Sequence, residues 1–311
     1  MVTSSDPEKG NAHDDSDTAG DINEINPAAR ATRWDIGKRI LPLTNRPLVM
    51  GILNVTPDSF SDGGKHAATQ DAIAAAIRMQ SDGADIIDIG GESTRPDSDP
   101  VSTDEELARV VPVIEGLAGK LSIPISIDTS KAIVAEHAIA SGAEIINDVT
   151  GLEGDRNMCA VARNSGVGVC VMHMKGTPQT MQIDPRYDNV VEEIADYLIQ
   201  RRDFCIEHGI GAERICLDPG IGFGKTHQHN LTLLRATKRF VAIGSPILIG
   251  HSRKGFIAKL LGDKLADRTA ATIGVSLAVA AAGAHVIRVH DVKETCDALK
   301  LFDAAGALDP T

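Results

Sequence analysis

The chain has 311 residues, of which 42% are hydrophobic and only 3% aromatic, and its formal net charge is −12. This length allows one large α/β barrel or two medium domains, and either would bury a substantial core. The acidic balance argues against a nucleic-acid-binding protein, because phosphate backbones require a basic surface.

The first part of the chain, residues 1–33, differs from the rest. It is rich in Asp and Glu and shows little apolar periodicity, so we expect a flexible tail. It has neither the basic start nor the apolar stretch of a signal peptide, and no segment is apolar enough for a membrane span. The five cysteines lack C-x-x-C spacing, which is typical of free thiols in a reducing compartment. A cytoplasmic protein that does not bind membranes is therefore expected.

Eight short apolar runs follow and are predicted to form β-strands. They lie at residues 48–53, 85–89, 124–127, 144–146, 167–172, 214–217, 246–249 and 285–289. Helix-length amphipathic stretches separate them, including residues 70–81, 103–118, 131–141, 189–208 and 268–282. This alternation is typical of parallel strands joined by right-handed helical crossovers. Eight such units favour a closed (β/α)₈ TIM barrel, in a single domain over residues 34–311, over an open doubly wound sheet.

One junction recurs along these elements. The segments GADIID at 83–88, GAEIIN at 142–147 and GAHVIR at 283–288 follow the same pattern. A helix ends at the glycine, which tolerates the left-handed cap conformation, and a short loop leads into a buried strand. The spacing between the three copies is irregular, so the pattern indicates a repeated helix-to-strand connection and not a solenoid.

Polar side chains follow the predicted strands directly. They are Asn54, Glu92, Asp128, Asn147, His173, Asp218, Arg253, Lys254 and His290. In a (β/α)₈ barrel these positions converge on the C-terminal mouth, where such enzymes place their chemistry. Contact with solvent would also explain polarity at strand ends. It does not explain the choice of Asp, Asn, Lys, Arg and His over Ser, Thr and Gly.

The acidic and amide side chains of this group suit a flat ligand. Asp128, Asn147 and Asp218 follow three different strands, and an enclosed carboxylate requires a matched donor. A heterocycle with two adjacent N–H donors provides one, because a carboxylate grips such an edge through two parallel hydrogen bonds. The alternative for Asp128, just before a predicted helix, is a helix N-cap.

The basic side chains suit an anion. Arg288 and His290 are two residues apart on a strand, so both are expected to point into the barrel mouth. Together with the segment after the seventh strand, they occupy the usual phosphate site of this fold. The alternatives are that Arg288 bridges surface acids and that His290 is a structural histidine.

The segment PGIGFGKT at 219–226 nearly matches a Walker A loop. Pro219 stands where that motif requires glycine, so we reject a nucleotide-hydrolysing function. Its glycines are expected to let the backbone approach a flat ligand, with Phe223 as a wall or lid. Two further Gly-bearing loops, at 56–64 and 90–96, are expected to act as mobile lids.

Eight motifs in a fixed order carry a resemblance to a known family. They are NVTPDSFSDGG, GGESTRP, SIDTSK, IINDV, MHM, LDPGIGFGK, SRK and RVHDV, and the similarity runs from about residue 48 to about residue 304. The combination resembles the dihydropteroate synthases, folate-pathway enzymes that join a pterin to p-aminobenzoate. The resemblance implies condensation of 6-hydroxymethyl-7,8-dihydropterin pyrophosphate with p-aminobenzoate, which requires Mg²⁺ and no protein nucleophile, in a homodimer.

The resemblance also implies roles for individual residues. The expected Mg²⁺ ligands are Asn54 and Asp62. The expected pterin contacts are Asp128, Asn147, Asp218, Lys254 and Phe223. The pyrophosphate is assigned to Asn54, Arg288, His290 and Thr94. The p-aminobenzoate pocket and its lids are assigned to Phe60, Ser61, Thr94, Arg95, Pro96, Ser252 and Gly255. Of these residues, Arg288, His290, Lys254 and Asp128 are expected to be catalytic.

Two positions depart from the family pattern. Many members have Ser where this chain has Gly255, so the site for p-aminobenzoate is expected to be slightly altered, with a backbone N–H in place of the hydroxyl. His251 is also unusual, and the sequence offers no account of it. Two other functions stay open: a methyltetrahydrofolate-dependent methyltransferase of the same barrel type, and a non-catalytic pterin-binding paralogue.

Overall fold

The computed structural model describes Met1 and residues 30–56, 64–93, 99–263 and 265–308. Its centre is a parallel sheet of eight strands in the order β8-β7-β6-β5-β4-β3-β10-β9. An isolated parallel bridge between Leu217 and Ile247 joins the two edge strands of this order. The sheet therefore curls into a nearly closed barrel, as the alternation of predicted elements indicated.

All eight predicted strands are confirmed, and five of them extend one or two residues further at the carboxyl end. They are β3 (Leu48–Asn54), β4 (Ile86–Gly90), β5 (Ile125–Asp128), β6 (Ile145–Asp148), β7 (Gly168–Met172), β8 (Ile215–Asp218), β9 (Leu248–Ile249) and β10 (Val286–Val289). Because of this extension, Asn54, Asp128 and Asp218 are the last residues of their strands. Backbone hydrogen bonds to the neighbouring strands therefore fix the positions from which these polar side chains project.

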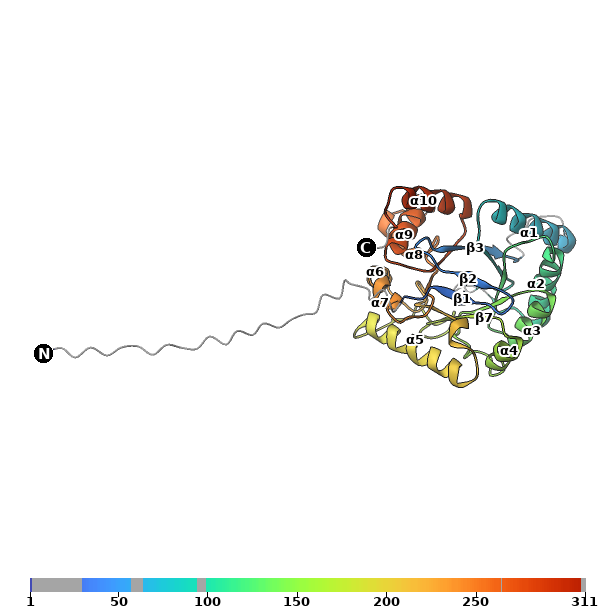
Figure 1. Cartoon of the computed structure of the whole chain (residues 1–311), viewed down its shortest axis with the longest axis horizontal. Helices are drawn as coiled ribbons and strands as arrows, with labels where there is room; N and C mark the ends of the chain where they lie inside the picture. Colours follow the sequence, from blue (N-terminus) through green and yellow to red (C-terminus); the bar gives the residue numbers. More distant parts are fainter. Residues whose placement is uncertain (2–29, 57–63, 94–98, 264, 309–311) are drawn as a thin grey trace.

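Helices surround the strands (Figure 1). They are α1 (Gly64–Ser81), α2 (Thr103–Leu117), α3 (Ala132–Ser141), α4 (Met158–Ser165), α5 (Val190–Glu207), α6 (His227–Arg235), α7 (Thr237–Val241), α8 (Gly255–Leu261), α9 (Thr269–Ala281) and α10 (Val292–Ala304), with a 3₁₀ turn at Ala212–Arg214. The helix predicted at 70–81 begins earlier, at Gly64, and the other predicted helices agree within one residue. Among the described residues, no helix combines the length and apolar character needed to cross a membrane.

Side chains alternate between two cores along each strand. In β4, Ile87 and Ile89 face the surrounding helices, whereas Ile86 faces the barrel interior. The inner cluster also includes Met50 of β3, Ile145 of β6 and Cys170 of β7. Since successive side chains of a strand point to opposite faces, the next inward position of β4 is Asp88. The interior is therefore apolar at its amino-terminal end and polar above it.

A short antiparallel hairpin covers the amino-terminal end of the barrel. It consists of β1 (Arg33–Asp35) and β2 (Ile40–Pro42), and it was not predicted from the sequence. Trp34 is fully buried in the inner cluster and donates from Nε1 to the carbonyl oxygen of Arg214 (2.9 Å). Arg30 donates to the carbonyl oxygen of Thr44 (2.9 Å), so residues 30–33 of the predicted tail contact the folded domain. Residues 2–29 lie outside the described part of the chain.

Candidate active site

The predicted polar residues gather at the carboxyl ends of the strands. Asn54, Asp128 and Asp218 end their strands, Asn147 lies in β6 and Arg288 in β10. Lys254 follows β9 after a short connection, and His290 directly follows β10. Because the strands are parallel neighbours in one barrel, these side chains share the mouth at its C-terminal face. The fold thus brings these predicted residues to one end of the barrel, and their individual roles stay predictions.

Arg288 is the centre of this group. Its Nε donates to Asp88 Oδ2 (2.6 Å), and one terminal nitrogen donates to Asp128 Oδ2 (2.6 Å). Asn147 Nδ2 donates to the same oxygen of Asp88 (3.0 Å). The alternative reading of Arg288 as a bridge between surface acids is wrong, because the side chains of Asp88 and Asp128 are only 0% and 11% exposed. Asp128 is also no helix cap, since Lys131 occupies the N-cap position of α3.

Asp88 is the residue of this group that the site prediction missed. A signal for it was present in the sequence, because Asp88, Asn147 and Arg288 occupy the sixth position of the three recurring junctions. Each junction places that residue at the same height of a strand with its side chain inward. The three side chains that hydrogen-bond to one another are thus equivalent positions of one local pattern.

The glycine-rich loop after β8 wraps around Lys254. The Lys254 ammonium donates to the carbonyl oxygen of Ile221 and lies 4.4 Å from the centre of the Phe223 ring. Gly222 has φ +85°, and a Cβ there would lie 2.8 Å from Lys254 Cδ. Asp218 is anchored in the same loop by the backbone N–H of Gly220 (2.7 Å). The absence of a side chain at Gly222 thus makes room for Lys254, which lies against the ring of Phe223. This arrangement agrees with the predicted ligand-binding loop and not with a Walker A loop.

A buried lysine that the sequence reading also missed fixes this loop to β7. Lys225 Nζ lies 3.0 Å from His173 Nδ1 and donates to the carbonyl oxygen of Phe223 (2.8 Å). Burial lowers the pKa of Lys225 well below its ordinary value, and burial lowers the pKa of His173 to about 3. His173 is therefore neutral near pH 7 and serves as a fixed partner of the loop.

Burial shifts the pKa values of the central groups toward neutrality. It raises the pKa of Asp128 to about 7, although Arg288 acts in the opposite direction. It raises the pKa of Asp218, with Lys254 opposing the shift. Burial also lowers the pKa of Lys254 to about 7, against the attraction of Asp218. Perturbed titratable groups gathered in one place are typical of a functional site.

The segment after β9 is tied to β10 and α9. The backbone N–H of His290 donates to Ser252 Oγ (3.2 Å), which also lies 2.9 Å from His290 Nδ1. His251 is fully buried, and its Nε2 lies 3.1 Å from the carbonyl oxygen of Thr272 and 2.9 Å from Ser276 Oγ. This explains the unusual His251 as an anchor between the site and α9. Gly255 is the first residue of α8, and a Cβ there would meet no atom within 4 Å.

Part of the predicted site lies outside the described residues. This applies to the predicted lid and metal residues Phe60, Ser61, Asp62, Thr94, Arg95 and Pro96, whose roles stay predictions. The base of the second loop is described. Lys131 Nζ contacts Glu92 Oε2 (2.5 Å) and the buried Glu106 Oε2 (2.6 Å), so an ion-pair cluster anchors this loop to α2 and α3.

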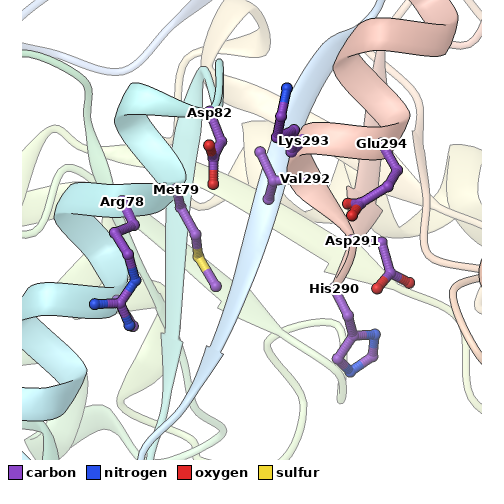
Figure 2. Close-up of a pocket in the computed structure, with 9 residues that line it drawn as sticks. Arg78, Met79, Asp82, His290, Asp291, Val292, Lys293 and Glu294 are labelled. Atoms are coloured by element: carbon purple, nitrogen blue, oxygen red, sulfur yellow. The ribbon is translucent and has the colours of Figure 1, made fainter.

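A cavity of about 320 Å³ lies beside His290, between α1 and α10 (Figure 2). Arg78, Met79 and Asp82 approach it from the α1 side, and the first residues of α10 from the other. Its titratable side chains are of both signs, so it does not select an anion by charge. His290 belongs both to this cavity and to the cluster at the strand ends.

Comparison with known proteins agrees with this geometry. The family model described as pterin binding enzyme matches residues 50–290. A dihydropteroate synthase of Neisseria meningitidis serogroup C is 48% identical over 277 residues, covering 88% of this chain and 97% of that protein.

Two solved structures of Xanthomonas albilineans dihydropteroate synthase are similar throughout the fold. The structure with 4-aminobenzoic acid has a TM-score of 0.83 at 44% identity and covers 89% of this chain and 99% of that one. The complex with 7,8-dihydropteroate has a TM-score of 0.80 at 42% identity and covers 88% and 99% of the two chains. Barrel, strand-end residues and relatives together show that this chain belongs to the pterin-binding enzyme family and, within it, to the dihydropteroate synthases.

Proposed function

We propose that this chain condenses 6-hydroxymethyl-7,8-dihydropterin pyrophosphate with p-aminobenzoate to give 7,8-dihydropteroate and pyrophosphate. The observation that carries the proposal is the cluster of Asp128, Asn147 and Arg288 at the barrel mouth, beside Asp218 and Lys254. The similar structures with 4-aminobenzoic acid and 7,8-dihydropteroate support the same pair of substrate and product.

The pterin is assigned to the buried acidic side of the cluster. Asp128 and Asp218 are carboxylates at two strand ends, and ionised carboxylates accept the paired N–H donors of a flat pterin edge. Asn147 adds an amide between them. Lys254 and the ring of Phe223 form one wall of this space. Positive charge that spreads into the pterin as pyrophosphate departs is stabilised by the two carboxylates.

The pyrophosphate is assigned to Arg288, His290, Asn54 and the predicted Thr94. During the reaction the bond between the methylene carbon and the pyrophosphate oxygen breaks, and the leaving group takes the electron pair. The amino nitrogen of p-aminobenzoate then forms a bond to that carbon and releases a proton. Arg288 and His290 stabilise the departing anion, and the fixed geometry of the site positions the two reactants.

Mg²⁺ is proposed as the cofactor. Asn54 provides a side-chain carbonyl oxygen at the end of β3, which is a suitable ligand for a hard cation. Among the described residues, no group of three or more His, Cys, Asp or Glu side chains could hold a metal. A protein that contributes one or two oxygens, with the rest coming from phosphates and water, is typical of Mg²⁺. Asn54 and Asp62 would hold the ion, which neutralises leaving-group charge when bound.

p-Aminobenzoate is assigned to the outer part of the mouth. Ser252, in the segment after β9, and Gly255, at the start of α8, are assigned to this side. The predicted lid residues Phe60, Ser61, Thr94, Arg95 and Pro96 complete this pocket in the proposal. The dihydropteroate synthase family further suggests a cytoplasmic protein that forms a homodimer. Sedimentation of the purified protein would test the dimer.

The function is tested by incubating the purified protein with the pterin pyrophosphate, p-aminobenzoate and Mg²⁺. We expect pyrophosphate and dihydropteroate in equal amounts and no product when EDTA replaces Mg²⁺. Pterin binding without pyrophosphate release would identify a non-catalytic paralogue instead. Methyl transfer from methyltetrahydrofolate, with no dihydropteroate formed, would identify the methyltransferase.

A further inference from the structure

Asp88 lies beneath the residues assigned to the substrates and has no role in the mechanism described so far. Its side chain is 0% exposed, and its strand neighbours Ile87 and Ile89 are also fully buried. A single oxygen of this carboxylate, Oδ2, accepts from both Arg288 Nε (2.6 Å) and Asn147 Nδ2 (3.0 Å). One buried acceptor thus connects a residue assigned to pyrophosphate with a residue assigned to pterin.

The bond to Asp88 fixes the plane of the Arg288 guanidinium. A guanidinium donates through a rigid planar fork, so two bonds to separate acceptors determine its orientation. Here Nε is held by Asp88 on β4, and one terminal nitrogen is held by Asp128 on β5. The two strands are adjacent and in register. Without Asp88 the guanidinium would keep one anchor and could rotate about it.

Asp88 also determines which end of the Asn147 amide faces the ligand. An asparagine amide has one donor end and one acceptor end. Because Nδ2 donates to Asp88, the amide oxygen of Asn147 points away from this carboxylate. The amide then presents an acceptor to a ligand N–H. A donor at position 88 would favour the opposite orientation.

Burial of this carboxylate is not explained by packing alone. A buried carboxylate is costly unless it is paired, and an apolar residue of similar volume would fill the same space. Its second oxygen, Oδ1, has no hydrogen-bond partner among the described residues. The neighbour in register on β5 is Ser126, whose hydroxyl is likewise buried and without a described partner. The described hydrogen bonds of the Asp88 carboxylate are therefore those that it accepts from Arg288 and Asn147.

We propose that Asp88 is a positioning residue for the condensation, which holds Arg288 and the Asn147 amide in the orientation that the substrates require. This inference rests on the proposed function of the site. No substrate contact is assigned to Asp88, which acts through its two partners.

The test is the nearly isosteric substitution Asp88→Asn. The new amide keeps one acceptor but places a donor against Arg288 or Asn147, so both partners lose their fixed orientation. Misplacement of a catalytic group by about 1 Å lowers turnover by roughly 100-fold, and we expect a loss in kcat of that order. The KM for p-aminobenzoate, which binds on the outer side, is expected to stay unchanged. The KM for the pterin pyrophosphate is expected to rise.

Ser126→Ala is the matched control, because Ser126 is the buried in-register neighbour with no role in the site. Its kcat should equal that of the wild type. If Asp88→Asn retains wild-type kcat, the inference is overturned. It is also overturned if the loss of kcat only follows the unfolded fraction and disappears at a temperature where the variant is folded.

Asp88→Ser is the second variant if Asp88→Asn does not fold. Its hydroxyl takes the position of the lost Cγ and falls short of Arg288 and Asn147, so both lose their common acceptor and a loss of kcat is expected with p-aminobenzoate KM unchanged. Wild-type kcat in this variant would also overturn the inference. A wild-type protein that releases no pyrophosphate contradicts the proposed function instead, which keeps the two failures distinguishable.

Discussion

At the residue scale, the site depends on a few buried charges that compensate one another. Arg288 compensates two buried carboxylates, and Lys254 lies close to a third at Asp218. Removing one member of a buried pair is more damaging than removing both, because it leaves an uncompensated charge. Function and stability are therefore coupled at Arg288.

Arg288→Ala should abolish turnover and destabilise the protein. Loss of the guanidinium leaves Asp88 and Asp128 unpaired, and breaking a buried pair lowers the free energy of unfolding by about 3 to 5 kcal/mol. Urea unfolding and the pyrophosphate assay measure the two effects. The control is Arg253→Ala, because Arg253 pairs with Asp291 with half of its side chain exposed, and an exposed pair contributes about 1 kcal/mol or less. Equal turnover in Arg288→Ala would contradict its assignment to pyrophosphate.

Pterin affinity should depend on pH in a bell-shaped manner. The pKa of Asp128 is raised to about 7, so its carboxylate is lost as pH falls below that value. The pKa of Lys254 is lowered to about 7, so its ammonium is lost as pH rises above it. Titration of 6-hydroxymethylpterin by calorimetry should therefore show the tightest binding near pH 7. Asp128→Asn should lose the acidic limb and Lys254→Met the alkaline limb; an unchanged profile in both variants would refute the assignment.

At the element scale, loops and caps position what the strands provide. The loop after β8 wraps around Lys254, Lys225 fixes that loop to β7, and His251 anchors the segment after β9 to α9. The first two contacts connect neighbouring βα units, whereas the contact of His251 lies within the unit that follows β9. The loop glycines are the positions least tolerant of substitution, because an added Cβ would collide with neighbouring backbone or side-chain atoms.

Gly222→Ala should weaken pterin binding because its Cβ would displace Lys254. The added carbon would lie 2.8 Å from Lys254 Cδ, and the glycine has φ +85°. Gly262→Ala is the matched control, since Gly262 has φ +72° but no atom within 4 Å of its Cβ. Both variants should lose about 1 kcal/mol of stability from backbone strain. Only Gly222→Ala should raise the KM for the pterin substrate, and an equal KM in both variants would exclude the steric effect.

At the scale of the whole molecule, chemistry and packing occupy opposite ends of the barrel. Polar residues fill the carboxyl end, whereas the β1–β2 hairpin and the inner apolar cluster fill the amino end. Activity therefore depends mainly on residues at the carboxyl end, and stability depends more on residues at the amino end. Substitutions at the amino end are expected to change stability without changing the chemistry.

Trp34→Ala should lower the free energy of unfolding by about 3 to 5 kcal/mol, because it removes a large buried side chain and leaves a cavity. Its kcat and both KM values should stay at wild-type levels wherever the variant is folded. Ile40→Ala in the same hairpin is the control, since Ile40 is 54% exposed and should have little effect. Denaturant unfolding and steady-state kinetics distinguish the two effects. A kcat loss in folded Trp34→Ala would show that the hairpin reaches the site.

The local pattern of this chain determined the strands, five of the ten described helices and the residues at the strand ends. This was possible because alternation, turn residues and motif order are properties of neighbouring positions. The recurring junction even contained Asp88, Asn147 and Arg288 in equivalent places. What it could not show is that these three positions form one hydrogen-bonded group.

Only the tertiary structure decided which of these residues contact one another. Asp88 and Arg288 are 200 positions apart, so no local pattern describes their bond. The hairpin around Trp34 was missed for the same reason, because two three-residue strands gain their stability from the barrel that they cover. The shifted pKa values of Asp128 and Lys254 likewise depend on burial, which exists only when the barrel closes.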